Sequence, residues 1–188
     1  MTKQELRKLY LEKRRNLTDG ECSDLNLKLY NYFFASLDLS FIHVLHLYLP
    51  IEGKREPDTW MILDRLRREF PHVRISIPRI GATEELENIF FEGPHQLQIN
   101  AMGIQEPKQG VPTLVEKIDL VIVPLLSFDR QGYRVGYGKG YYDRFLRLCR
   151  PDCKKIGLSF FPYVEHIDID SHDVRLDGCV TPTGTNFF

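Results

Sequence analysis

The spacing of apolar residues predicts helices in the N-terminal part of the chain. Leu6, Leu9 and Tyr10 recur at helical spacing behind Thr2–Glu5 (TKQE), which has the form of a capping box. Thr18-Asp19-Gly20 is expected to end this first helix. Two further stretches with apolar residues at steps of three and four are Cys22–Leu37 and, behind an N-cap at Asp58-Thr59, Trp60–Phe70.

Short apolar runs bounded by proline or polar residues predict strands that are buried in a sheet. Asp119–Val123, directly before Pro124, is the clearest of them. Val73–Ile77 is expected to end at Pro78, and the chain after Pro162 is expected to be mostly loop. The other predicted elements are strands at Phe41–Leu49, Ile89–Phe91 and Lys155–Phe160 and a helix at Tyr141–Leu148.

Alternation of these strands and helices predicts an α/β protein. The expected arrangement has three layers, with helices flanking a mainly parallel central sheet. The chain of 188 residues is long enough to bury a core without disulfides or metal. It contains no internal repeat, low-complexity segment or interdomain linker, so we expect a single domain over residues 1–188.

Composition and charge argue against several classes of partner. The formal net charge is -1, so the protein has no overall field that attracts nucleic acid or an anionic membrane. There is no run of about 18 apolar residues and no apolar signal segment near the N-terminus. We therefore expect a cytoplasmic monomer without nucleic-acid or membrane partners. The 4 cysteines lack a zinc-binding pattern and are expected to be reduced thiols.

A long glycine-rich segment, Phe128–Asp143, carries the candidate chemistry. It follows the clearest strand and precedes a helix, the place where open α/β sheets bind ligands. Gly136, Gly138 and Gly140 allow backbone N–H groups to approach a phosphate closely, and Arg134 and Lys139 add positive charge. The pattern is neither a P-loop nor a dinucleotide fingerprint. Taken alone, it fits a phosphate site or a tight glycine turn equally well.

The run Phe128–Arg144, F-D-x-x-G-x-R-V-G-x-G-x-G-Y-Y-D-R, resembles the signature of the 5-formyltetrahydrofolate cyclo-ligase family. One position departs from it: Tyr137 stands where some members carry arginine. That charge is either absent here or supplied by another residue, for which Arg134 is the candidate. The Leu49-to-Glu56 loop is also slightly longer than in some relatives. Further matches follow in family order, namely Lys3-x-x-x-Arg7, Leu49 with Glu56-Pro57-Asp58-Thr59, Gly103-Ile104-x-Glu106-Pro107, and His172-Asp173-x-x-x-Asp177 with Thr181.

The resemblance implies a fold and a reaction. The fold is similar to the NagB/RpiA/CoA-transferase-like fold. The reaction is the ATP- and Mg²⁺-dependent cyclisation of 5-formyltetrahydrofolate to 5,10-methenyltetrahydrofolate, with release of ADP and phosphate. Phosphorylation of the formyl oxygen would create a leaving group, and N10 of the folate would then attack the activated carbon.

The resemblance also implies roles for individual residues. Catalysis is assigned to Arg134, Lys139 and Tyr141, and Mg²⁺ to Asp143 and Asp173. The folate is expected to contact Leu49, Glu56, Tyr137, Gly138, Lys139, Gly140 and Tyr141. ATP is expected to contact Lys3, Arg7, Arg134, Val135, Gly136, Tyr137, Gly138, Lys139, Gly140, Tyr141 and Tyr142.

Simpler interpretations exist for several of these residues. Lys3 and Arg7 lie one helical turn apart and fit an ordinary solvated helix face. Tyr141 and Tyr142 fit core packing at a helix start, and Asp143 fits a first-turn carboxylate favoured by the helix dipole. Asp173 fits a turn or cap, and Glu56 fits a solvated loop charge.

Two other functions also fit the pattern. A sugar-phosphate isomerase or CoA-dependent transferase on a similar α/β scaffold would use an anion-binding glycine loop without ATP. An RNA-binding module would use the basic N-terminal helix, because residues 1–15 hold six Lys/Arg against two Glu. ATP dependence separates the cyclo-ligase from the former, and steeply salt-dependent binding would favour the latter.

Overall fold

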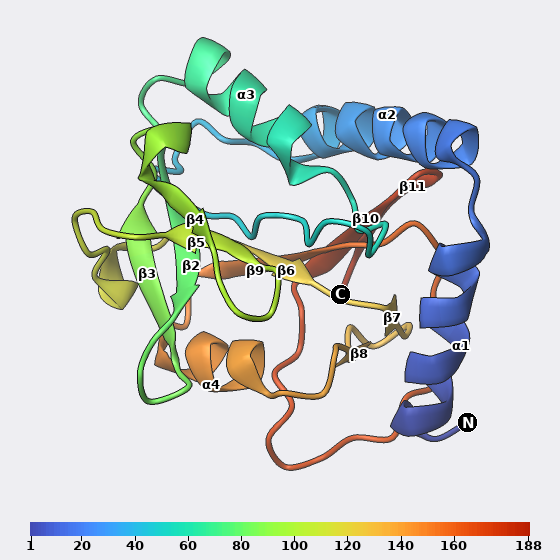
Figure 1. Ribbon diagram of the computed structural model, residues 1–188. Coiled ribbons are helices and arrows are strands. Elements are labelled where there is room, and N and C mark those ends of the chain that lie inside the picture. Colours follow the sequence, from blue (N-terminus) through green and yellow to red (C-terminus); the bar gives the residue numbers. More distant parts are fainter.

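A seven-stranded sheet forms the centre of the computed structural model, which describes residues 1–188 (Figure 1). Five neighbouring strands are parallel, and an antiparallel strand closes each edge. This arrangement confirms the predicted mainly parallel sheet. In spatial order the strands are β11 (Gly184–Phe187), β10 (Gly178–Thr181), β9 (Lys154–Leu158), β6 (Leu120–Pro124), β1 (Val44–His46), β2 (Arg74–Ile80) and β3 (Leu86–Phe90).

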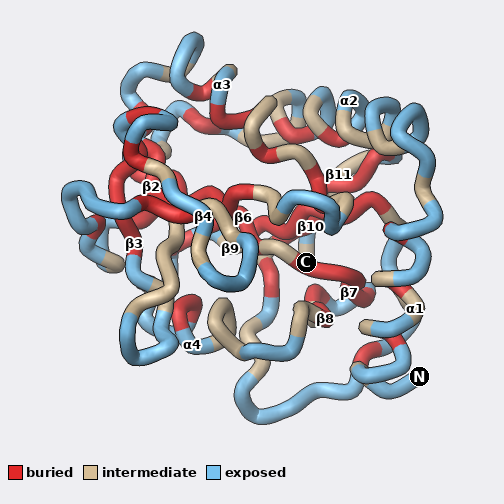
Figure 2. The backbone as a smooth tube through the Cα atoms, viewed as in Figure 1, coloured by how far each residue is buried: buried red, intermediate tan, exposed pale blue.

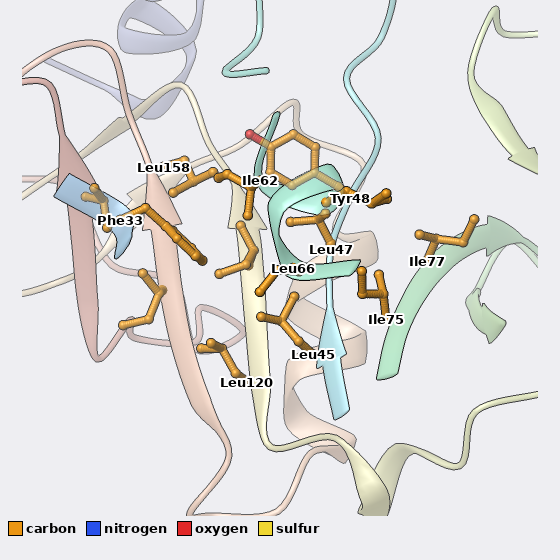
Figure 3. Close-up of a cluster of buried hydrophobic side chains, with 14 of the residues drawn as sticks. Phe33, Leu45, Leu47, Tyr48, Ile62, Leu66, Ile75, Ile77, Leu120 and Leu158 are labelled. Atoms are coloured by element: carbon orange, nitrogen blue, oxygen red, sulfur yellow. The ribbon is translucent and has the colours of Figure 1, made fainter. Parts of the chain in front are cut away.

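Helices cover both faces of the sheet and so make the three layers (Figure 1). α2 (Asp19–Ser36) and α3 (Thr59–Glu69) lie on one face, where Phe33 and Leu66 pack with Leu45 and other strand residues (Figure 3). α4 (Tyr141–Leu148) covers the other face, and its Phe145 belongs to a second cluster that contains Val121 and Val123. Apolar residues therefore point to both faces of the central strands, as a parallel sheet requires. Figure 2 shows the backbone of these strands as mostly buried.

α1 (Lys3–Asn16) lies beside one end of the sheet, next to the hairpin of β7 (Ser127–Phe128) and β8 (Arg134–Val135) (Figure 1). Its Leu6 and Tyr10 pack with Leu126 and Val135 in a small cluster of their own. The remaining elements are peripheral to the sheet. They are the 3-10 helices at Pro94–Gln96 and Val115–Lys117 and the pair β4 (Leu97–Ile99) and β5 (Gln105–Pro107).

The starts predicted for α1 and α3 are confirmed by their hydrogen bonds. Thr2 and Glu5 form the capping box of α1. α2 begins at Asp19, before the predicted Cys22, because Thr18 with Glu21 forms a second capping box that was not predicted. Asp58 caps α3 by accepting a hydrogen bond from the Trp60 N–H at 3.0 Å. Each cap satisfies an N–H group that has no partner inside its helix.

The predicted end of one strand is wrong, and another pair of strands was missed. β2 continues through Pro78 and pairs there with Asn88 of β3. Pairing with β1 ends at Ser76, so Pro78 needs no N–H donor on that side. The chain after Pro162 is mostly loop, as predicted, but it also contains β10 and β11, which the sequence analysis missed. Both strands have only 4 residues, and β11 is polar and only partly buried. The sequence therefore lacks the apolar run that would predict a strand here.

Segments that are distant in the sequence meet on one side of the sheet. The segment between β9 and β10 runs past the N-terminal end of α1 and below α4 (Figure 1). β1, β2 and β6 end on this side of the sheet, beside the loop that leads into α4. None of the helices has both the length and the apolar character needed to cross a membrane.

Candidate active site

A cavity of about 790 Å³ lies where β1, β2 and β6 end. This is the side of a parallel sheet on which α/β proteins bind ligands. Every residue to which the sequence assigned a role lines it. These are Lys3, Arg7, Leu49, Glu56, Arg134, Val135, Gly136, Tyr137, Gly138, Lys139, Gly140, Tyr141, Tyr142, Asp143 and Asp173.

The glycine loop forms one wall of the cavity, between β8 and α4. Gly138 and Gly140 have φ values of 92° and 71°, a region that disfavours residues with a Cβ. A Cβ on Gly138 would also lie 3.1 Å from the guanidinium carbon of Arg7. The loop conformation and the approach of α1 therefore both depend on glycine at this position.

α1 contributes two cations to the same wall. The Arg7 Nε–H donates to the Gly136 carbonyl at 2.9 Å, which joins α1 to the glycine loop. The Lys3 ammonium lies 2.6 Å from Asp170 and 2.5 Å from Asp173. Burial alone lowers the pKa of Lys3, but its hydrogen bonds to the two carboxylates outweigh this effect and raise the pKa. Lys3 thus remains charged inside the cavity mouth.

Lys139 differs from these residues because its ammonium has no partner. The side chain is exposed at the cavity, and no carboxylate or carbonyl accepts a hydrogen bond from its Nζ. Neighbouring Tyr141 is half-buried at the start of α4, with the Arg144 guanidinium 5.4 Å from its ring centroid. An unpaired cation and a partly open aromatic ring beside a glycine loop are free to contact a ligand.

Glu56 lies on a second wall and is almost fully buried. Its Oε2 accepts from the Ile51 N–H at 2.7 Å, and its Oε1 accepts from the Tyr137 hydroxyl at 2.6 Å. The solvated-loop interpretation of Glu56 is therefore wrong, since its side chain is only 3% exposed. Burial and the Glu56 charge raise the pKa of Tyr137, so its phenol keeps the proton that it donates.

Arg14 of α1 contacts the Tyr137 hydroxyl, although the sequence analysis did not single out Arg14. Its guanidinium donates to the Tyr137 hydroxyl at 2.8 Å and to the Leu125 carbonyl. The signal was present in the helical spacing, because Arg14 falls on the same face of α1 as Arg7 and Tyr10. Arg134, the expected source of positive charge near Tyr137, is instead paired with Asp143 at 2.8 Å.

Tyr142 is anchored from below by a buried histidine. Its hydroxyl lies 3.1 Å from Nε2 of His46, a residue with 0% exposure. Burial lowers the pKa of His46 to about 3, with a partly opposing contribution from Asn88, so the imidazole is neutral. Burial and the charge of Glu56 raise the pKa of Tyr142. His46 is thus a buried residue beneath the cavity wall, whereas His43, three positions earlier, is exposed.

The carboxylates expected to bind Mg²⁺ both lie in the cavity wall and both have other partners. Asp143 accepts from Arg134 through Oδ1, and Asp173 accepts from Lys3 and the Asp170 N–H through Oδ2. The opposite oxygen of each carboxylate makes no hydrogen bond within the protein. No group of three or more ligating side chains is present. This donor set fits Mg²⁺ in the mode that uses one or two carboxylates together with phosphate oxygens and water.

Other wall residues were given no role by the sequence analysis. Glu106, which belongs to the matched segment Gly103–Pro107, is buried, and its carboxylate accepts from the Ile80 N–H and the Asn100 amide, each at 3.1 Å. The tertiary fold brings further residues without an assigned role to the wall, and they include Tyr48, Met102, Ile104, Arg144, Arg147 and Asp170.

Comparison with known proteins identifies the family to which the chain is similar. The sequence model of the 5-formyltetrahydrofolate cyclo-ligase family matches residues 1–182. The 5-formyltetrahydrofolate cyclo-ligase of Mycoplasma genitalium is 32% identical over 178 residues, covering 93% of this chain and 94% of that protein. The corresponding protein of Escherichia coli K12 is 25% identical over 176 residues, covering 92% and 96%.

A solved structure gives the same result for the fold. The NMR structure of 5,10-methenyltetrahydrofolate synthetase from Aquifex aeolicus superposes with a TM-score of 0.85 at 31% identity. The match covers 100% of this chain and 93% of the other. With the family model spanning nearly the whole sequence, the chain belongs to the 5-formyltetrahydrofolate cyclo-ligase family.

Proposed function

We propose that this enzyme uses ATP, with Mg²⁺, to convert 5-formyltetrahydrofolate into 5,10-methenyltetrahydrofolate, ADP and phosphate. The observation that carries the proposal is the composition of one cavity. A glycine loop with the unpaired Lys139 and the α1 cations forms one wall, and the buried carboxylate of Glu56 belongs to another. The first wall suits a polyphosphate, and the second suits a ring rich in N–H donors.

The chemistry requires a better leaving group than the formyl oxygen. Transfer of the γ-phosphoryl group of ATP to that oxygen breaks the bond to the β-phosphate and releases ADP. N10 then attacks the formyl carbon, and loss of phosphate leaves the methenyl bridge. Such a reaction depends on position and charge stabilisation more than on covalent help from the protein.

The glycine loop and α1 are proposed to hold the triphosphate. Lys139 is the strongest candidate for contact with the transferred phosphoryl group, because its ammonium is exposed and unpaired. Lys3 and Arg7 approach from α1, and Arg7 is already joined to the loop through Gly136. The backbone N–H groups of the loop and the positive end of α4 add partial charge.

Glu56 is proposed to hold the folate ring. Two of its lone-pair sites are used by Ile51 and Tyr137, and the others are free to accept N–H donors from the ligand. Leu49 and Tyr141 would contact the flat ring from the cavity wall.

Asp143 and Asp173 are proposed as the carboxylates for Mg²⁺. Each has one oxygen without a hydrogen bond, and the two residues line the same cavity as the glycine loop. When bound, the ion would neutralise charge on the phosphate oxygens. Asp143 would at the same time keep Arg134 in place.

The test is a direct assay. Purified enzyme is mixed with 5-formyltetrahydrofolate, ATP and Mg²⁺, and the near-ultraviolet absorbance of the methenyl product is followed. We expect product only when ATP is present. Lys139→Ala should lower turnover on the order of 100-fold.

Lys117→Ala is the matched control, because Lys117 is also exposed but lies outside the cavity. Its turnover should equal that of the wild type. Product formation without ATP, or none at all from a folded protein that binds ATP, would contradict the proposed reaction.

A further inference from the structure

Arg14 is a buried cation inside the protein, although it belongs to a helix whose other basic side chains lie nearer solvent. Its exposed fraction is 2%, and its guanidinium donates to the Tyr137 hydroxyl and the Leu125 carbonyl. The distance from its NH1 to Glu56 Oε1 is 3.9 Å. A charge placed this deep costs free energy unless a partner of opposite sign compensates it.

Glu56 has the same need from the other side. Its side chain is 3% exposed, and Arg14 is the only cation within 4.0 Å of its carboxylate. Removing the charge of either residue would leave the other buried without compensation. The two residues, 42 positions apart in the sequence, thus form one electrostatic unit.

Tyr137 joins Arg14 to Glu56 with a fixed direction. A guanidinium has only donors, so the Tyr137 oxygen must accept from Arg14. Its one proton is then committed to Glu56, which accepts it at 2.6 Å. The Tyr137 hydroxyl is thus fixed between Arg14 of α1 and Glu56, and together with the Ile51 N–H it orients the Glu56 carboxylate.

We propose that Arg14 is a positioning residue that, acting through Tyr137, orients the Glu56 carboxylate to accept the ring N–H groups of the folate. This inference rests on the proposed function and deepens it by assigning the source of charge on the folate side. Here α1 supplies the cation, since Arg134 is paired with Asp143.

The contacts of α1 separate the two sides of the site. Arg7 reaches the glycine loop at the Gly136 carbonyl, toward the proposed triphosphate. Arg14 lies two turns further along the same helix and donates to Tyr137, the loop residue after Gly136. Tyr137 in turn donates to Glu56, on the side of the proposed folate. A change at Arg14 should therefore alter folate binding and leave ATP binding almost unchanged.

The experiment compares Arg14→Met, Arg14→Lys, Glu56→Gln and the double variant Arg14→Met with Glu56→Gln. KM and kcat are measured separately for 5-formyltetrahydrofolate and for ATP. Arg14→Met should raise the folate KM about 10- to 100-fold, the range expected for directly coupled residues. The ATP KM should change by less than about threefold. Arg14→Lys should recover part of the loss.

The double variant tests the coupling itself. In the Glu56→Gln background no buried carboxylate needs compensation, so Arg14→Met should add no more than about a threefold further rise in folate KM. Equal rises in the two KM values, or the same Arg14→Met effect in both backgrounds, would overturn the proposal. Arg15→Met is the matched control, because Arg15 is exposed and adjacent on the same helix.

Tyr137→Phe covers the case in which Arg14→Met does not fold. It removes only the bridging hydroxyl, so it should raise the folate KM selectively, and an unchanged folate KM would overturn the proposal. Failure of the proposed function has a different signature. Wild-type enzyme that forms no methenyl product would refute that function and the inference with it, whereas an active wild type with unaffected variants would refute the inference alone.

Discussion

The two walls of the cavity are built in opposite ways. The glycine loop has an open backbone and an exposed, unpaired cation at Lys139. The wall around Glu56 is buried, and hydrogen bonds join Arg14 to Tyr137 and join Tyr137 and the Ile51 N–H to Glu56. One wall leaves its binding groups free until a ligand arrives, and the other holds them ready beforehand.

The difference follows from the ligands proposed for each wall. A polyphosphate carries several charges and many equivalent oxygens, so exposed cations and backbone N–H groups bind it without strict geometry. A heterocyclic ring presents a few donors in one plane, and a carboxylate recognises them only when its own plane is fixed. The comparison predicts that substitutions in the buried wall cost stability and binding together, whereas Lys139→Ala leaves the unfolding midpoint unchanged.

Glu56→Ala should have the largest effect. It removes the proposed ring anchor and also leaves Arg14 buried without a carboxylate partner. We expect kcat/KM for the folate to fall by at least about 100-fold and the free energy of unfolding to fall by about 3 kcal/mol. Steady-state kinetics and urea unfolding measure the two quantities. Glu52→Ala, an exposed residue of the same loop, is the control. Undiminished stability in Glu56→Ala would contradict the buried-wall description.

Acid should weaken the buried side through His46, which supports Tyr142. The pKa of this imidazole is about 3 in the folded protein and near 6.5 when it is free, because burial disfavours the cation. The unfolded chain therefore binds a proton that the folded protein does not. The stability is fully present above pH 6.5 and is lost as the pH falls toward 3. Between pH 7 and pH 5 the loss from this group is about 2 kcal/mol.

His46→Phe isolates that contribution. The variant lacks the titrating imidazole, so its free energy of unfolding should depend less steeply on pH between 7 and 5 than that of the wild type. Chemical unfolding at several pH values measures the slope. His43→Phe is the control, because His43 is exposed and its removal should leave the slope unchanged. Equal slopes in wild type and His46→Phe would contradict a neutral buried His46.

Much of the fold could be predicted because local patterns carry it. The capping boxes at Thr2 and Thr18 and the apolar run of β6 are specified by neighbouring residues. β10 and β11 could not be found in this way. They pair with each other across a tight turn, and β9, the other partner of β10, ends twenty positions before β10 begins, so only tertiary pairing defines them.

The candidate site was predictable to the extent that it is a loop. The glycine segment and Lys139 form a contiguous pattern, and the family resemblance added Glu56 and Asp173. Arg14 and Asp170 were missed because each acquires its partner only when α1 packs against the rest of the protein. Arg14 then contacts Tyr137, and Asp170 then contacts Lys3 of α1. The exposed wall can thus be predicted from one segment of the sequence, whereas prediction of the contacts in the buried wall requires the tertiary structure.

Gly138→Ala should have the smallest effect and sharpens the description of the exposed wall. An alanine at this position would have to keep the φ of 92°, which is unfavourable for a residue with a Cβ. The Cβ would also lie 3.1 Å from the guanidinium carbon of Arg7, so the loop and α1 must shift apart slightly. We expect the ATP KM to rise about tenfold while the free energy of unfolding falls by only about 1 kcal/mol. Gly20→Ala is the matched control, because Gly20 lies in α2 and a Cβ there would meet no atom within 4 Å. That variant should keep normal kinetics and gain up to about 1 kcal/mol of stability. A Gly138→Ala enzyme with an unchanged ATP KM but a raised folate KM would reverse the assignment of the two walls.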